Sequence, residues 1–383
     1  MNKQKKNNNL IIAVACTAMI TFSITYLVVK FFNYRTMKPY RLIAETENYI
    51  DRYFYFDKAD KDEMIDSAIE GFVNALDDKY SRYQSLQITS ERNDSQAGVH
   101  TGIGITVSRN EEGYMIIEEV REKTPAEKAG LLKDDIITAL DSKDVVETGY
   151  NESVDYIKNG EENSTLVITL KRGSETIDIE VKREKIEIIT SEARMMEDYI
   201  GYINITQFNE KTPEQVQKNF TELLSQGAKG IIFDVRNNGG GLVSSVEKCL
   251  DPLLPEGDIA VAVYKDGREE TIVKSDAEET DIPMTVLVNK NSASGAELFA
   301  ASLRDFKNTE LVGTTTFGKG IMQDTFELSN GSTVVLTVAA YKTTRSECYH
   351  GTGLVPDFEI ENDESGYDFQ LDKATEVVKK KIN

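Results

Sequence analysis

Ser294 and Lys319 are the residues of this sequence whose types and settings could carry a reaction. Ser294 follows a predicted strand at residues 284–289 and precedes apolar residues at helical spacing, so it is predicted to lie between a strand and a helix. There its hydroxyl would be exposed, and the N–H groups at the start of the helix could stabilise a developing oxyanion. A serine in this position is also a common helix cap, so the local pattern alone does not single out a nucleophile.

A nucleophilic serine needs a base, and candidates are few in a chain of 383 residues with two histidines, His100 and His350. His350 lies in a glycine-rich stretch and is more typical of a structural or surface residue. Lys319 lies between Gly318 and Gly320, which permit close backbone approach, and burial can turn a lysine into a neutral base. A lysine in such a turn is also commonly solvated. Spacing alone therefore leaves a Ser–Lys pair and a Ser–His pair open.

The composition argues against several other classes of function. The chain has 44 basic and 65 acidic side chains, a net charge of −21 and no basic stripe, so no nucleic-acid partner is expected. Two histidines nearly exclude a multi-histidine metal site, and Cys16, Cys249 and Cys348 lack the spacing of metal ligands or of a disulfide framework. The sequence therefore predicts no metal site, and a pairing of Cys249 with Cys348 is left open.

The N-terminus carries a predicted membrane anchor. Residues 10–29 form an uncharged, apolar run that follows three lysines, and a helix of this length spans about 30 Å, the thickness of a bilayer core. A cleaved signal peptide is the alternative, but the small residues of a cleavage site should follow the run, where charged and bulky residues stand instead. We expect a cytoplasmic tail at residues 1–9, a single-pass anchor at 10–29 in the cell membrane, and the body of the protein outside the cytoplasm.

The remainder of the chain divides into four regions by pattern. Residues 30–96 have apolar residues at helical spacing and predict a helical N-terminal region. Residues 97–183 change to short strands with turn signals, which predicts a compact β module. In residues 184–360 strands alternate with helices, which predicts an α/β core with its site at the strand ends, and residues 361–383 form a helical tail. The expected fold class is multidomain, with α+β and α/β parts.

Five motifs in a consistent order make the chain resemble the carboxyl-terminal processing proteases, the tail-specific serine peptidases of family S41. Asn291–Glu297 resembles the family's Ser-Ala-Ser-x-x-Glu nucleophile loop, and Phe317–Gln323 resembles its Phe-Gly-Lys-Gly-x-x-Gln segment. The other three motifs are Leu76–Tyr83, Asp234–Gly241 and Gly351–Asp357. The resemblance runs from about residue 42 to 358, from the helical N-terminal region to an α/β serine protease core.

The resemblance implies a role for each of five residues. Ser294 would attack the scissile carbonyl, Lys319 would be the general base, and Gln323 would orient the lysine. Backbone N–H groups of Gly240 and Gly295 would form the oxyanion hole. A neutral amine is needed near pH 7, so Lys319 must be desolvated and held by an amide rather than a carboxylate. No metal or organic cofactor is implied.

The β module at residues 97–183 resembles the family's PDZ domain, and Gly102, Ile103, Gly104 and Ile105 resemble its carboxylate-binding loop. That resemblance implies that backbone N–H groups hold a peptide's C-terminus while the peptide adds a strand. We therefore expect a membrane-anchored serine endopeptidase, a hydrolase that cleaves proteins near their C-termini. Its partners would be protein substrates with free C-termini, and a homodimer is left open. The rival interpretation is a catalytically idle PDZ scaffold that only captures C-termini.

Overall fold

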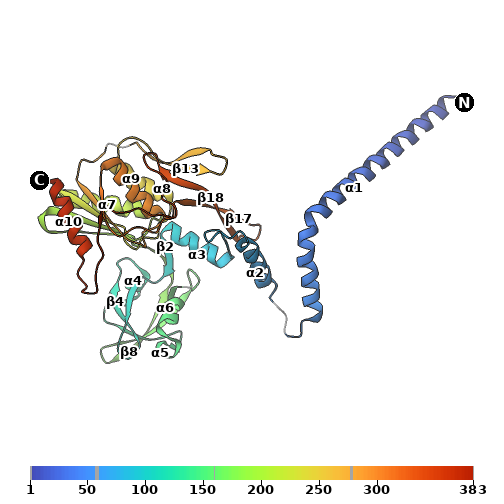
Figure 1. Cartoon of the computed structure of the whole chain (residues 1–383). Coiled ribbons are helices and arrows are strands. Elements are labelled where there is room, and N and C mark those ends of the chain that lie inside the picture. The colour runs from blue at the N-terminus through green and yellow to red at the C-terminus, as the bar shows by residue number, and fades with distance from the viewer. Residues whose placement is uncertain (1, 57–59, 159, 277–278, 383) are drawn as a thin grey trace. The chain divides into compact units, whose positions relative to one another are not determined.

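The structure is a computed structural model that describes residues 2–56, 60–158, 160–276 and 279–382; of these, the side chains of residues 2–16, 29 and 31–39 lie outside the description. The chain divides into two compact units, Met1–Ala68 and Ile69–Asn383. Helix α1 (Asn2–Tyr53) makes up most of the first unit, and helix α2 (Lys61–Asn74) begins in the first and ends in the second. Figure 1 follows these elements by colour from the N-terminus to the C-terminus.

Helix α1 contains the predicted membrane anchor. Among the residues whose side chains are described, no helix has a stretch long and apolar enough to cross a membrane. The predicted tail at residues 1–9, and residues 10–16 and 29 of the predicted anchor, lie outside those residues. The anchor and the location of the body therefore stay predictions.

The predicted helical region at residues 30–96 also contains a strand. After α2 the chain forms β1 (Arg82–Gln84) and then helix α3 (Leu86–Ala97). Strand β1 pairs antiparallel with β18 (Thr333–Thr343), with Arg82 opposite Val335. Three residues are too few to show the alternation of a strand, so this element depends on its distant partner rather than on its own pattern.

The elements from β2 to β8 form a β module around a core of their own. The main sheet has the order β3–β4–β5–β7–β8, with β6 added to β5. Its inner face is built by alternate apolar residues such as Leu166, Ile168 and Leu170, because successive side chains of a strand point to opposite faces. The elements are β2 (Val99–Gly102), β3 (Ile105–Arg109), β4 (Met115–Val120), α4 (Pro125–Ala129), β5 (Ile136–Leu140), β6 (Lys143–Asp144), α5 (Val145–Thr148), α6 (Tyr150–Lys158), β7 (Thr165–Arg172) and β8 (Glu175–Lys182).

The predicted α/β core begins after the β module. Its main sheet has the order β10–β11–β12–β15–β16–β19, in which β10 is antiparallel and the others are parallel. A second sheet has the order β1–β18–β13–β14, with β17 also paired to β18. The strands are β9 (Glu184–Glu187, paired with β2), β10 (Ser191–Met195), β11 (Ile200–Ile205), β12 (Gly230–Asp234), β13 (Gly257–Tyr264), β14 (Glu269–Ser275), β15 (Met284–Val288), β16 (Glu310–Gly313), β17 (Ile321–Glu327) and β19 (Phe358–Glu359).

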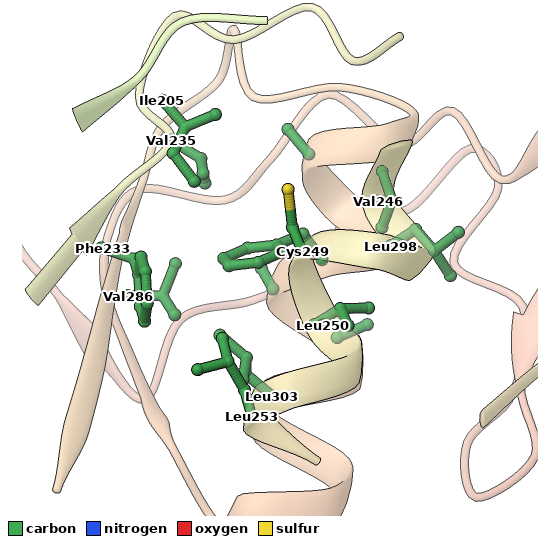
Figure 2. Packing of buried hydrophobic residues seen from close by; sticks show 14 of the residues in the cluster. Ile205, Phe233, Val235, Val246, Cys249, Leu250, Leu253, Val286, Leu298 and Leu303 are labelled. Atoms are coloured by element: carbon green, nitrogen blue, oxygen red, sulfur yellow. The ribbon is translucent and has the colours of Figure 1, made fainter. Parts of the chain in front are cut away.

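Helices cover both faces of the main sheet of the core. Phe233 of β12 and Val286 of β15 face Leu250 of α8 and Leu303 of α9, as Figure 2 shows. Ile232, the neighbour of Phe233, points to the opposite face and packs with α10. Strands buried on both faces are nearly continuous in apolar residues, and every residue of β15 except Thr285 is apolar. The helices are α7 (Thr212–Ser225), α8 (Val243–Leu250), α9 (Gly295–Lys307) and α10 (Phe369–Ile382), with 3-10 turns η1 (Glu197–Tyr199) and η2 (Asp251–Leu253).

The predicted fold class is confirmed: N-terminal helices, a β module and an α/β core follow one another along the chain. The two described cysteines of the core, Cys249 and Cys348, are both free, so the pairing left open by the sequence is not formed. Cys249 is buried among the apolar residues between the main sheet and helices α8 and α9 (Figure 2).

Candidate active site

Ser294 occupies the predicted position between β15 and α9, at the N-cap of the helix. Its backbone has φ +55° and ψ −116°, a conformation that residues other than glycine rarely adopt. Such strain persists only where surrounding contacts hold it, and it concentrates at functional sites. Ser294 is half-buried.

The buried carboxylate of Glu297 holds Ser294 and Lys319 in one assembly. Its Oε2 accepts hydrogen bonds from the N–H of Ser294 at 2.9 Å and from the N–H of Lys319 at 2.8 Å. Its Oε1 accepts from the N–H of Gly318 at 2.7 Å and from Thr316 Oγ1. The side chain is fully buried, and four donors compensate for the lost hydration of its charge. One carboxylate thus fixes the loop that carries Ser294 (the serine loop, residues 291–297) against the segment that carries Lys319 (the lysine loop, residues 316–320).

The Lys319 side chain is half-buried beside Tyr80 of the segment before β1. Its Nζ lies 5.1 Å from the centroid of the Tyr80 ring, a cation–π arrangement. Burial lowers the pKa of Lys319, and the positive charge of Arg82 lowers it further, whereas Asp78 and Glu297 oppose this change. The lowered pKa is the direction that a lysine base requires.

Ser294, Lys319 and Gln323 are not joined by hydrogen bonds among the described residues of this structure. The Gln323 amide Nε2 donates to the backbone oxygen of Ile321 at 3.3 Å. Catalytic contacts are often long in the absence of substrate and tighten in the reacting complex. The structure therefore brings Ser294 and Lys319 together through Glu297, and the catalytic roles of all three residues stay predictions.

The glycine loop after β12 packs directly against the serine. A Cβ on Gly240 would lie 2.7 Å from the Gly295 nitrogen, so only glycine fits at position 240. The φ of Gly240 is +102°, a backbone conformation that also favours glycine. The Gly240 N–H donates to Asn238 Oδ1 at 2.8 Å. For the N–H groups of Gly241 and Gly295, the described residues provide no acceptor. Within the described part of the chain, the N–H groups of Gly241 and Gly295 beside Ser294 are thus without an acceptor.

Three residues that the sequence analysis gave no role complete the site. Glu297 stands three residues after Ser294, the spacing of a capping box, so a sequence signal for it existed. Tyr341 of β18 is buried and donates its hydroxyl to the Lys319 carbonyl oxygen at 2.8 Å. Burial raises the pKa of Tyr341, which keeps this donor protonated. Tyr341 had no local signal, and Tyr80 lies in the Leu76–Tyr83 motif, which did not indicate a contact with the lysine; tertiary pairing brings both tyrosines there.

His350, the alternative base, lies at the edge of this region. Its ring centroid is 6.1 Å from that of Tyr80, and the residue is exposed. No hydrogen bond joins His350 to Ser294 in the described part of the chain.

Asp234 and Arg236 of the glycine-loop motif have a structural function. The Arg236 guanidinium makes ion pairs with Asp234 at 2.6 Å and with Asp368, just before α10, at 2.8 Å. Tyr202 donates its hydroxyl to Asp234 at 2.7 Å. The loop beside Ser294 is thereby tied to the C-terminal helix.

The predicted carboxylate-binding loop of the β module lines a cavity of about 660 Å³ together with β3 and α6. Strand β3 is at the edge of its sheet, so it can accept another strand. Gly104 has φ +88°, and a Cβ there would lie 2.3 Å from Thr124, so glycine is required at this turn. The arrangement suits an extended peptide laid between β3 and α6 with its end at residues 102–105.

Comparison with known proteins agrees with this arrangement. Residues 199–360 match peptidase family S41, and residues 101–182 match the PDZ domain. The chain is 35% identical over 309 residues to the carboxy-terminal processing protease CtpA of Bacillus subtilis (strain 168), covering 80% of this chain and 66% of that protein. It is 30% identical over 354 residues to a probable CtpA-like serine protease of Staphylococcus aureus (strain COL), covering 90% of this chain and 71% of the relative.

The chain is also similar to a third curated relative and to a solved structure. A probable CtpA-like serine protease of Staphylococcus haemolyticus (strain JCSC1435) is 33% identical, and the chain spans 62% of it, so the chain covers somewhat less than two thirds of this relative and of the Bacillus protein. The photosystem II D1 C-terminal processing protease is similar with a TM-score of 0.50 and 26% identity, covering 88% of this chain and 90% of that one. The chain therefore belongs to peptidase family S41, as a relative of the carboxy-terminal processing proteases that carries a PDZ domain.

Proposed function

We propose that the chain is a serine endopeptidase that cleaves proteins near their C-termini, with Ser294 as nucleophile and Lys319 as general base. The observation that carries the proposal is the Glu297 carboxylate, which accepts the N–H groups of both residues. Membership of family S41 and the names of the curated relatives support the same activity. A second function, peptide capture by the PDZ domain, is supported by the cavity along β3.

In the proposed reaction, neutral Lys319 Nζ takes the proton of Ser294 Oγ as the oxygen attacks the scissile carbonyl. The resulting ammonium then gives this proton to the leaving amine, and water repeats the sequence on the acyl-enzyme. Burial supports the neutral lysine, because it lowers the pKa of Lys319. For this step Nζ moves from the Tyr80 ring towards Ser294, and Gln323 orients it as an uncharged partner.

We assign the oxyanion hole to the N–H groups of Gly295 and Gly241. The Gly240 N–H, predicted for this role, already donates to Asn238. Its neighbour Gly241 has no acceptor among the described residues, and its nitrogen lies 3.3 Å from where a Cβ on Gly295 would be. Unpaired N–H groups held in place beside the nucleophile stabilise charge at little reorganisation cost.

Replacing Glu297 by Gln is expected to lower kcat/KM for a peptide substrate by about 100-fold. The glutamine amide keeps one acceptor oxygen and presents an NH₂ to backbone donors, so the serine and lysine loops lose their common anchor. Small displacements of catalytic groups cost about this factor. The measurement is kcat/KM with the melting temperature beside it. Glu270→Gln, an exposed carboxylate paired with Arg268, is the matched control. Full activity in folded Glu297→Gln would show that the carboxylate does not position the pair.

Amidation of a peptide's C-terminus is expected to weaken binding to the PDZ domain by about 10- to 100-fold. The amide has no charge for the loop N–H groups to bind, and a hydrogen bond to a charged group contributes about 1.5–3 kcal/mol. Fluorescence anisotropy with a labelled peptide and the full chain as Ser294→Ala, which prevents cleavage, measures the difference. Equal affinities would remove free-carboxylate recognition from the proposal.

We also propose that residues 10–29 anchor the chain in the cell membrane with the catalytic body outside the cytoplasm. The support is the sequence itself, an apolar run of membrane-spanning length preceded by lysines. The full chain is expected to sediment with membranes and to resist extraction by 1 M salt, which screens electrostatic contacts to within roughly 3 Å. A variant lacking residues 1–30 should be released. Sedimentation of both forms would contradict the anchor.

A further inference from the structure

The cavity of the β module has basic side chains beside its carboxylate-binding loop. His100, Arg121 and Lys158 all line it, together with Gly102 to Val107. A Cβ on Gly102 would lie 3.4 Å from both Cδ2 and Nε2 of His100, so the imidazole packs on the loop itself. The backbone of Arg121 also lies beside this loop, because its N–H donates a hydrogen bond to the Gly104 carbonyl oxygen at 3.0 Å. The chain has a net charge of −21, so a group of basic side chains at one end of the cavity is a local exception to its acidic character.

We propose that His100 is a titratable recognition group for the peptide carboxylate, acting beside the loop N–H groups and flanked by Arg121 and Lys158. The inference rests on the proposed capture of free C-termini. It adds a side chain to a site otherwise made of backbone groups, and it makes the affinity for C-termini depend on pH.

The charges around His100 favour an anion. Burial lowers the pKa of His100, and Arg121 and Lys158 lower it further, so both cations act on the ring. Asp155 of α6 is the acidic side chain among the described lining residues.

The facing strand β9 places Ile186 opposite His100 and Glu184 opposite Gly102. Each charged side chain of β9 has a partner: Glu184 pairs with Lys128 at 3.5 Å, Lys185 pairs with Asp94 at 2.6 Å, and Glu187 accepts from Gln215 at 2.8 Å. The guanidinium of Arg121 donates to the backbone oxygen of Glu187 at 3.4 Å, which holds this cation beside the cavity.

The direction of the pH effect follows from these charges. In the empty groove His100 is neutral at neutral pH, because burial and two cations disfavour its charged form. A bound carboxylate favours the imidazolium, so the pKa of His100 rises on binding and a proton is taken up. Affinity therefore increases as the pH falls. A rise of about one pKa unit corresponds to a tenfold change in affinity.

The test measures binding of a fluorescein-labelled decapeptide ending in valine with a free carboxylate, because the groove is lined by Ile103, Ile105 and Val154. With the full chain as Ser294→Ala, binding at pH 5.5 is expected to be about three- to tenfold tighter than at pH 8.0. Adding His100→Gln should remove this difference by weakening binding at pH 5.5. Adding Arg121→Gln should weaken binding at both pH values and keep the difference, and His350→Gln should change neither.

Proton uptake gives a second measurement that needs no histidine variant. Calorimetry at pH 6.5 in two buffers of different ionisation enthalpy should show net proton uptake when the peptide binds. Absence of uptake, or an unchanged pH difference in folded His100→Gln, would overturn the role of His100 while leaving capture of C-termini intact. Equal binding of acid and amidated peptides would instead overturn the proposed capture, and the role of His100 with it.

Discussion

Ser294→Ala is expected to abolish proteolysis of casein while leaving the fold intact. The change removes one oxygen, and loss of a nucleophile that acts with its base costs about 10⁴-fold or more in kcat. The backbone hydrogen bond from residue 294 to Glu297 does not involve the side chain, so the loop geometry should survive. The measurement is the rate of casein cleavage by the purified full chain, with the melting temperature as a check on folding.

Ser294→Ala also distinguishes the proposed serine protease from a catalytically idle PDZ scaffold. Ser294→Ala should bind free C-terminal peptides as the unmodified chain does, because the PDZ groove lies on other residues. Ser225→Ala, an exposed serine at the end of α7, is the matched control and should cleave casein normally. Cleavage at the unmodified rate by Ser294→Ala would end the serine-protease proposal. Absence of cleavage by every form, with peptide binding retained, would favour the scaffold.

Lys319→Arg is expected to be as inactive as Lys319→Ala, about 10²- to 10⁴-fold below the unmodified chain in kcat/KM. A guanidinium keeps its proton and cannot accept one from Ser294. The lowered pKa of Lys319 also sets the pH profile: the neutral amine increases as the pH rises through that pKa, so activity rises with pH on the acid side. Arg82→Gln removes a charge that lowers this pKa, so the acid limb should move to higher pH.

Lys79 offers a matched control for this experiment. Its Nζ lies 4.8 Å from the centroid of the same Tyr80 ring that Lys319 contacts, yet it is exposed. Lys79→Arg should therefore retain activity and an unchanged pH profile. Substantial activity in a folded Lys319→Arg protein would show that residue 319 supplies positive charge rather than a base, and the Ser–Lys assignment would be wrong.

Local pattern was sufficient for much of the fold and for the position of the serine. Residues 284–289 were predicted to form a strand followed by a helix, and Ser294 does lie at the start of that helix. The change from helical spacing to short strands near residue 97 likewise marked the β module. These features are encoded within a few neighbouring residues, where periodicity is informative.

What the sequence did not indicate depends on contacts between distant residues. Tyr341 reaches the Lys319 carbonyl because of the register of β18 against its neighbours, which no local pattern specifies. Tyr80 meets Lys319 because β1 pairs with β18. The choice between Gly240 and Gly241 as oxyanion donor depends on which N–H the Asn238 side chain occupies, and adjacent glycines look alike in a sequence.

The pairing of β1 with β18 has a consequence for the order in which the protein matures during synthesis. Arg82 to Gln84 leave the ribosome early, but their partners Val335 to Thr333 are translated near the end of the chain. The β module between them has its own apolar core and can fold as it emerges, because domains fold as units during synthesis. The tyrosine and arginine beside the lysine are therefore placed only when translation is almost complete. We expect chains that end before β18 to bind peptides through their C-termini without cleaving them.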